Sequence, residues 1–207
     1  MEAASTHPRI VHKSRESLPP DGLFRLLLDE GFPSPGFDPT VLDPLLEVVA
    51  LREFDTSLVS EGTPDWYLYL RADEAGFDAL VTGDLSQSGQ AEEMWALTRT
   101  SLSVVSWRNP EDDPVVAWGQ VIAYLPEIRR MIRHHGDSIV YLPHARLNTT
   151  QFGKSNDALG IIASQEGRST GEVRRQAEQS VREALEARGE LDRFEAALAA
   201  PGEKRQR

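Results

Sequence analysis

The sequence contains no cysteine among its 207 residues. This absence excludes disulfide bonds, thiolate metal sites and cysteine nucleophiles. The sequence also lacks any run approaching the roughly 18 apolar residues of a membrane span. Residues 1–20 lack the apolar segment of a secretory signal peptide. We therefore expect a cytoplasmic protein that does not associate with a membrane.

Basic residues are scarce relative to acidic ones. The chain has 22 Lys and Arg against 33 Asp and Glu, which gives a formal charge of −11 and opposes simple electrostatic capture of nucleic acid. The imbalance is local, since residues 21–135 hold eight bases and 20 acids (−12), whereas residues 136–207 hold 11 of each and residues 1–20 carry +1. Most of these acids are expected on a solvated surface, and the alternative for a few of them is convergence on a cation.

Short apolar runs alternate with helical patterns between residues 21 and 135. The expected strands lie at 23–28, 48–51, 77–82 and 101–107, and the expected helices at 40–47, 63–75, 91–98 and from 114 onward. Alternation of this kind is typical of an α/β fold with a mostly parallel sheet. We therefore expect one α/β domain over residues 21–135.

The regions that flank this domain have different patterns. Residues 1–20 are expected to form a flexible lead and residues 201–207 a tail. Residues 136–200 are expected to form a C-terminal, mostly helical segment, with a strand at 138–142 and helices at 155–166 and 170–188. The second of these helices carries one apolar stripe, formed by Val173, Ala177, Val181 and Leu185.

Three aspartates fall where expected strands end or an expected helix begins. Asp29 follows the first strand, Asp84 follows the strand at 77–82, and Asp65 lies in the first turn of the helix at 63–75. Ligands bind beyond the carboxyl ends of the strands in an open α/β sheet, and these three side chains could meet at that edge. Each also has a structural interpretation: Asp29 and Asp84 as turn residues, and Asp65 as a partner of the helix dipole.

A cluster of three carboxylates would need a cation. Carboxylates held together raise one another's pKa, and a divalent cation removes that conflict. Oxygen ligands select Mg²⁺ or Mn²⁺, and such a cation lowers the pKa of bound water and holds a phosphodiester for in-line attack. The three aspartates are therefore candidate metal ligands and catalytic residues for phosphodiester hydrolysis.

Three short motifs resemble those of PIN-like domains. Residues 26–33 (LLLDEGFP) are similar to the apolar strand that delivers the first metal-binding aspartate before a proline-containing loop. Residues 63–65 (TPD), with the helix after them, look like the second acidic position. Residues 80–84 (LVTGD) are similar to the late strand that ends in Thr-x-Asp and carries the third acid. The resemblance covers residues 23–131.

This resemblance implies a three-layer α/β fold and a metal-dependent ribonuclease that acts on RNA. Such domains are often the toxin of a toxin–antitoxin pair, so a cognate antitoxin is an implied partner. Asp29, Asp65 and Asp84 would be the catalytic ligands of Mg²⁺ or Mn²⁺.

The chain departs from the PIN-like pattern at one position. Related domains often place another acid two residues after the third, where this chain has Ser86. Candidates for a fourth acid, among which the sequence does not choose, are Glu92, Glu93, Asp112 and Asp113. The nearest candidates for contacts with substrate phosphates are Arg52 and Arg108, with surface salt bridges as the alternative.

The C-terminal segment supports a second hypothesis. Residues 167–177 (GRSTGEVRRQA) resemble the turn and second helix of ribbon–helix–helix DNA-binding antitoxins. In that fold two chains pair their strands in a homodimer and present alternate side chains to the major groove, as Arg146, Asn148 and Thr150 could do. The chain would then be a catalytically idle PIN-like module that binds DNA or a partner protein. A helical hairpin packed on the α/β domain is the structural alternative.

Overall fold

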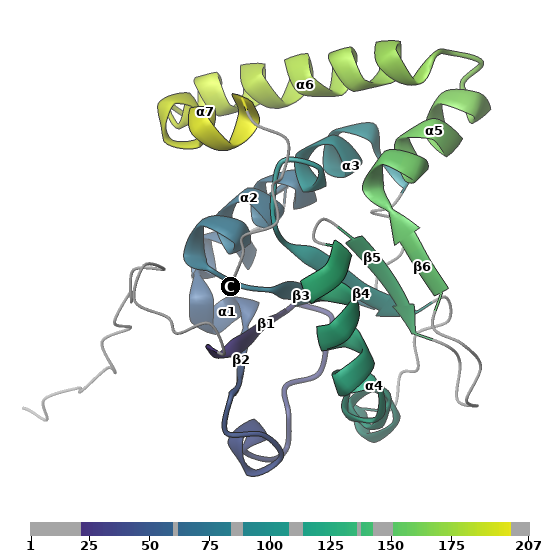
Figure 1. Ribbon diagram of the computed structural model, residues 1–207. Helices are drawn as coiled ribbons and strands as arrows, with labels where there is room; N and C mark the ends of the chain where they lie inside the picture. The colour runs from purple at the N-terminus through teal and green to yellow at the C-terminus, as the bar shows by residue number, and fades with distance from the viewer. Residues whose placement is uncertain are drawn as a thin grey trace, which may run out of the picture.

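A six-stranded sheet forms the centre of the molecule in the computed structural model, which describes residues 22–59, 62–83, 89–107, 114–135, 138–142 and 151–199 (Figure 1). The strands are β1 (Phe24–Leu28), β2 (Leu46–Ala50), β3 (Ala79–Val81), β4 (Ser103–Trp107), β5 (Ser138–Leu142) and β6 (Gln151–Lys154). Their order is β2-β1-β3-β4-β5-β6, with five strands parallel and β6 antiparallel to β5. The predicted α/β fold with a mostly parallel sheet is confirmed.

Helices cover both faces of this sheet. They are α1 (Leu51–Phe54), α2 (Asp65–Ala75), α3 (Ala91–Leu97), α4 (Pro114–His135), α5 (Ser155–Gln165), α6 (Thr170–Ala187) and α7 (Leu191–Ala199), with short 3-10 turns η2 (Pro39–Val41) and η3 (Thr56–Val59). Because neighbouring strand residues point to opposite faces, Leu26 and Leu28 belong to the core cluster that includes α4, whereas Leu27 belongs to the cluster that includes α2, α3 and the C-terminal helices. Figure 1 shows α6 lying outside α3 on the second face. The architecture is therefore three layers with additional C-terminal helices.

The local signals for α2 were sufficient to place it. The helix begins directly after Pro64 and ends at Gly76, which adopts the left-handed conformation with φ 88°. The predicted helix at 40–47 is wrong, because only the single turn η2 forms there and β2 already begins at Leu46. Pro44 lies inside the expected helix, and a proline removes a backbone donor and clashes with the preceding turn.

The sheet continues beyond the expected domain boundary at residue 135. Strand β5 pairs with β4, and β6 pairs with β5. The predicted apolar stripe of α6 is confirmed, since all four of its residues are at most 1% exposed and belong to the same core cluster as α3. Residues 138–142 and 151–199 therefore extend the sheet and cover it.

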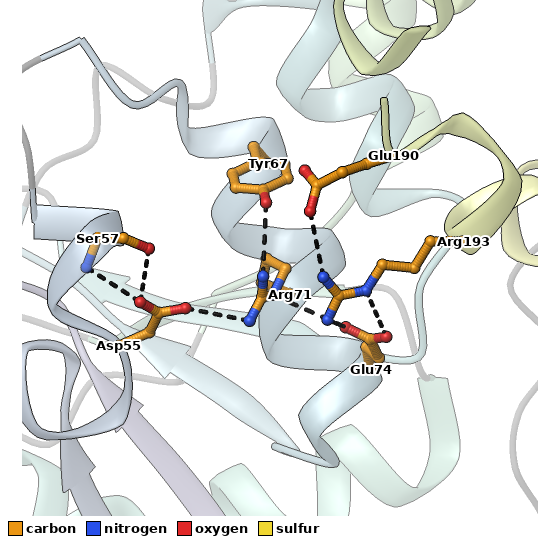
Figure 2. A network of polar contacts seen from close by, with 7 residues as sticks. All are labelled: Asp55, Ser57, Tyr67, Arg71, Glu74, Glu190 and Arg193. Carbon is orange, nitrogen blue, oxygen red and sulfur yellow. Dashed lines mark hydrogen bonds and ion pairs between the residues drawn. The ribbon is translucent and has the colours of Figure 1, made fainter. Parts of the chain in front are cut away.

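Helix α7 is tied to α2 by a polar network (Figure 2). Arg193 of α7 donates from Nε to Glu74 Oε1 at 2.7 Å, and Arg71 donates to Asp55 Oδ2 at 3.0 Å. The ring of Phe194 meets Tyr67 edge-on, with 6.2 Å between ring centroids. Residues 119 positions apart in the chain thus hold the C-terminal helix against the α/β core.

No described helix has the length and apolarity needed to cross a membrane.

Candidate functional site

The sheet has a topological switch point between β1 and β3. The chain leaves β1 toward β2 on one side, whereas β3, β4 and β5 follow on the other side. In open α/β sheets the crevice beyond the carboxyl ends of the strands at such a point is where ligands bind. The candidate site is therefore built from the residues that follow β1 and β3.

Asp29 lies at this point and is held in one orientation. It directly follows β1, and its backbone N–H donates to the carbonyl of Val81 at 3.0 Å, which extends the pairing of β1 with β3. Its Oδ2 accepts a hydrogen bond from Thr82 Oγ1 at 2.6 Å, and its Oδ1 accepts one from the Glu30 N–H at 2.8 Å. An ionised carboxylate offers about four lone-pair positions, so these two hydrogen bonds leave Asp29 with capacity to bind a cation.

A row of polar residues crosses the sheet at the level of Asp29. Leu28, Val81 and Val105 are aligned in β1, β3 and β4, so the next positions of the three strands are Asp29, Thr82 and Ser106. Thr82 and Ser106 are fully buried. The Ser106 hydroxyl makes no hydrogen bond with any residue that the structure describes. A buried hydroxyl of this kind calls for an explanation, and a water or ligand oxygen at the strand ends would satisfy it.

Asp65 is placed at the same edge by the path of the chain. It is the first residue of α2, which follows β2 and leads back to the start of β3. Because β2 and β3 both run parallel to β1, the N-terminus of α2 lies toward the carboxyl ends of the strands. The same argument applies to Glu92 and Glu93 in the first turn of α3, where Glu93 is buried. An acid in a first turn also complements the helix dipole, as expected for Asp65.

The remaining predicted ligands fall outside the described residues. This holds for Asp84, which follows Thr82 by two positions, and for the fourth-acid candidates Asp112 and Asp113. Within the described ranges, no three Asp, Glu or His side chains lie close enough together to hold a metal ion. The donor chemistry of Asp29 and Asp65 suits a hard divalent cation, and a set of three ligands at this edge would require Asp84.

The loop after Asp29 is anchored from both sides. The Trp118 indole N–H of α4 donates to the carbonyl of Pro33 at 2.8 Å, and its ring meets Phe32 edge-on. Arg52, the predicted phosphate contact, donates from Nη2 to Ser34 Oγ at 2.9 Å. Arg52 is exposed and forms no ion pair with a described residue, so its charge is available beside this loop. Arg108, the other predicted phosphate contact, lies outside the described residues.

Sequence reasoning missed the roles of Thr82 and Trp118. Thr82 entered only as part of the motif that carries Asp84, although its own hydroxyl fixes Asp29. The sequence signalled only a hydroxyl residue directly after a continuous apolar strand, and which acid that hydroxyl meets depends on the pairing of β1 with β3. Trp118 is one of the regularly spaced apolar residues of α4, and nothing in the sequence indicates the hydrogen bond from its indole N–H to the loop.

The C-terminal segment has the strand–helix–helix order of the second hypothesis. Strand β6 precedes α5 and α6, but β6 pairs with β5 of the same chain. The apolar stripe of α6 faces the core next to α3, as the alternative of a packed helical hairpin requires. The predicted DNA contacts lie outside the described residues: Arg146, Asn148 and Thr150.

Comparison with known proteins gives no match: no family model, no curated protein and no solved structure is significantly similar to the chain.

Proposed function

We propose that the chain is a divalent-metal-dependent endoribonuclease of the PIN-like type that hydrolyses RNA phosphodiester bonds at the carboxyl edge of its sheet. Asp29, Asp65 and Asp84 are the proposed ligands of Mg²⁺ or Mn²⁺. The observation that carries the proposal is the orientation of Asp29 by Thr82 at the switch point between β1 and β3. A carboxylate held by a fully buried partner at the ligand-binding edge is what a preorganised metal site needs.

Each residue has a separate role in this proposal. Thr82 and the Glu30 N–H each use one oxygen of Asp29, and so direct the remaining lone pairs of the carboxylate outward. Arg52 supplies a positive charge on the loop side of the edge, where a substrate phosphate needs compensation in an acidic domain. A divalent cation, when bound, lowers the pKa of its water and polarises the phosphodiester.

The proposed partners follow from the same function. The substrate is RNA, and the chain is the toxin of a toxin–antitoxin pair with a cognate antitoxin in the cytoplasm. The acidic charge of residues 21–135 means that attraction of RNA depends on the bound cation and local arginines, or on a basic partner protein.

Cleavage of a labelled RNA pool tests the proposal. The wild-type protein is incubated with the pool in Mn²⁺ and, separately, in EDTA, beside Asp84→Asn and a control variant. Asp157→Asn is the matched control, because Asp157 is an exposed aspartate in the first turn of α5 and follows β6, away from the carboxyl edge. We expect cleavage by wild type and Asp157→Asn in Mn²⁺, and loss of cleavage in EDTA or with Asp84→Asn.

Equal cleavage by Asp84→Asn and wild type would refute the proposed ligand role. Cleavage that persists undiminished in EDTA would refute the metal dependence. A thermal melt of each variant shows whether the protein remains folded, so that lost cleavage can be assigned to the site.

A further inference from the structure

A concave site lies at the opposite end of β1 from Asp29. A cleft of about 380 Å³ is lined by Asp43, Leu125, Pro126, Arg129, Arg130 and Arg133; these six residues are called the arginine cleft below. Arg129 stacks over the ring of Phe24, the first residue of β1, with its guanidinium carbon 5.0 Å from the ring centroid. Asp29 follows the last residue of β1, five positions later and about 16 Å along the strand. The arginine cleft is therefore separate from the candidate nuclease site.

The three arginines differ in how their charge is compensated. Arg129 lies between the ring of Phe24 and an ion pair with Asp43, and it forms one wall of the cleft. Arg130 pairs with Glu127, in an ion pair that is largely exposed and therefore weak. Arg133 is exposed and forms no ion pair with any described residue. The cleft thus presents positive charge that its own acids do not neutralise.

The surrounding charge makes this concentration unusual. Three of the eight basic residues of segment 21–135 fall within five positions, in a segment that carries −12. Attraction to the negative end of the α4 dipole accounts for a cation in the last helical turn, and so for Arg133. It does not account for Arg129 and Arg130, which lie further from the end of α4 at His135.

We propose that the arginine cleft binds a phosphate group. Arginine presents planar sets of N–H donors that match phosphate oxygens, and the cleft has the size of a small-ligand site. Leu125 and Pro126 supply apolar wall beside the cations, as a ligand with a carbon skeleton attached to its phosphate would need. Inorganic phosphate, a phosphomonoester and the phosphodiester of a nucleic acid share this chemistry.

Isothermal titration calorimetry at constant ionic strength tests the proposal without reference to catalysis. Inorganic phosphate is titrated into wild type, Arg133→Gln and Arg175→Gln, and a second series in EDTA uses a short RNA oligonucleotide without terminal phosphates. Arg175 is the matched control, because it is an exposed arginine of α6 that lines no part of the cleft. We expect binding by wild type and Arg175→Gln, and affinity about tenfold or more weaker in Arg133→Gln.

The two series distinguish the source of the phosphate. Arg133-dependent binding of inorganic phosphate alone assigns the cleft to free phosphate or a phosphomonoester, and Arg133-dependent binding of the oligonucleotide alone assigns it to a phosphodiester. Absence of binding in both series, or equal affinity in Arg133→Gln and wild type, would overturn the proposal. Because neither series measures cleavage, failure of the nuclease proposal leaves this result interpretable.

Discussion

At the scale of single residues, the hydrogen bond from Thr82 to Asp29 fixes the orientation of the Asp29 carboxylate. The two residues lie 53 positions apart, and the parallel pairing of β1 with β3 brings them together. Thr82 is fully buried, so its hydroxyl has little exchange with water. A hydrogen bond to a charged acceptor in such a position is among the stronger ones in a protein.

Replacement of Thr82 by valine keeps the side-chain shape and removes the donor to Asp29. We expect Thr82→Val to lower the free energy of unfolding by about 2 kcal/mol, as measured by denaturant unfolding, and to reduce RNA cleavage. Thr82→Ser retains the hydroxyl, so most of the cleavage should return with it. Equal cleavage by Thr82→Val and wild type would show that Asp29 does not depend on this bond.

Gly76 and Gly119 differ in backbone conformation, so replacing each by alanine should have opposite effects on stability. Gly76 ends α2 with φ 88°, and a side chain in the left-handed region costs about 1–2 kcal/mol. Gly119 is an exposed position inside α4, with no atom within 4 Å of where a Cβ would lie. We expect Gly76→Ala to destabilise the protein by about that cost, and Gly119→Ala to stabilise it by up to about 1 kcal/mol. Denaturant unfolding of both variants measures the difference, and changes of the same sign would contradict it.

The sequence could place Asp29 at a strand end, because a continuous apolar run that stops at an acid before Gly and Pro is a local pattern. The bond to Thr82 was not predictable in the same way, since it depends on the register between two strands that are distant in the chain. Ser106 enters the polar row for the same reason. Side-chain pairing across a sheet is tertiary information, which no periodicity contains.

At the scale of elements, local start and stop signals explain most of what was predicted. Helix α2 has its proline and acid at the start and its glycine at the end, and the strand at 138–142 was expected at the bounds it has. The expected helix at 40–47 does not form, because it would contain Pro44. Helix α6 begins at Thr170 as expected, and Ser169 is its N-cap residue. Element type was thus readable where caps and periodicity agree.

The cap of α6 gives a prediction on stability. Ser169 accepts from the Glu172 N–H, and the Glu172 carboxylate accepts in return from the Ser169 N–H at 2.9 Å. We expect Ser169→Ala to cost about 1 kcal/mol in the free energy of unfolding, measured by denaturant unfolding at neutral pH. Gly171→Ala, in the same turn, leaves both capping groups in place and serves as the control, which should not lower the stability. No loss with Ser169→Ala would contradict the capping box.

The same cap gives a pH dependence. The side-chain and backbone hydrogen bonds with Ser169 lower the pKa of Glu172 from its ordinary value of 4.5. The stabilisation is therefore fully present above that value and is lost as the pH falls through the lower pKa of the folded protein. Ser169→Ala should reduce stability more at neutral pH than in acid, and a cost that is independent of pH would contradict the lowered pKa.

At the scale of the whole molecule, the C-terminal helices and the α/β sheet share one core. The division expected at residue 135 followed a change in charge and pattern, but β5 and β6 continue the sheet and α6 packs on α3. Sequence patterns could reveal the apolar stripe of α6 and could not reveal which surface it covers. The three-layer fold was therefore predictable, and the way β5, β6 and the helices α5 to α7 extend and cover the sheet was not.

The attachment of α7 separates apolar packing from ion pairing. Phe194 is 3% exposed and packs against Tyr67, whereas the neighbouring Arg193 forms partly exposed ion pairs with Glu74 and Glu190 (Figure 2). We expect Phe194→Ala to cost about 3–5 kcal/mol and Arg193→Gln less than about 1 kcal/mol. Both variants should unfold in one cooperative transition, because the core is shared. Separate melting of a C-terminal unit would contradict this description.

The acidic and basic residues of the molecule are unevenly distributed along the chain. Within the acidic residues 21–135, the carboxyl edge is where acids are proposed to hold a cation, and the arginine cleft at the other end of β1 is a local concentration of basic residues. A net charge of −11 therefore does not determine which ligands the molecule binds. The ligands depend instead on where charged side chains lie along the sheet.

Binding of Mn²⁺, measured by electron paramagnetic resonance, tests directly whether the carboxyl edge holds a divalent cation through Asp29, Asp65 and Asp84, as proposed. We expect a bound-Mn²⁺ population in wild type and Asp157→Asn that is lost in both Asp29→Asn and Asp84→Asn. Equal Mn²⁺ binding by all four proteins, or none by wild type, would contradict it.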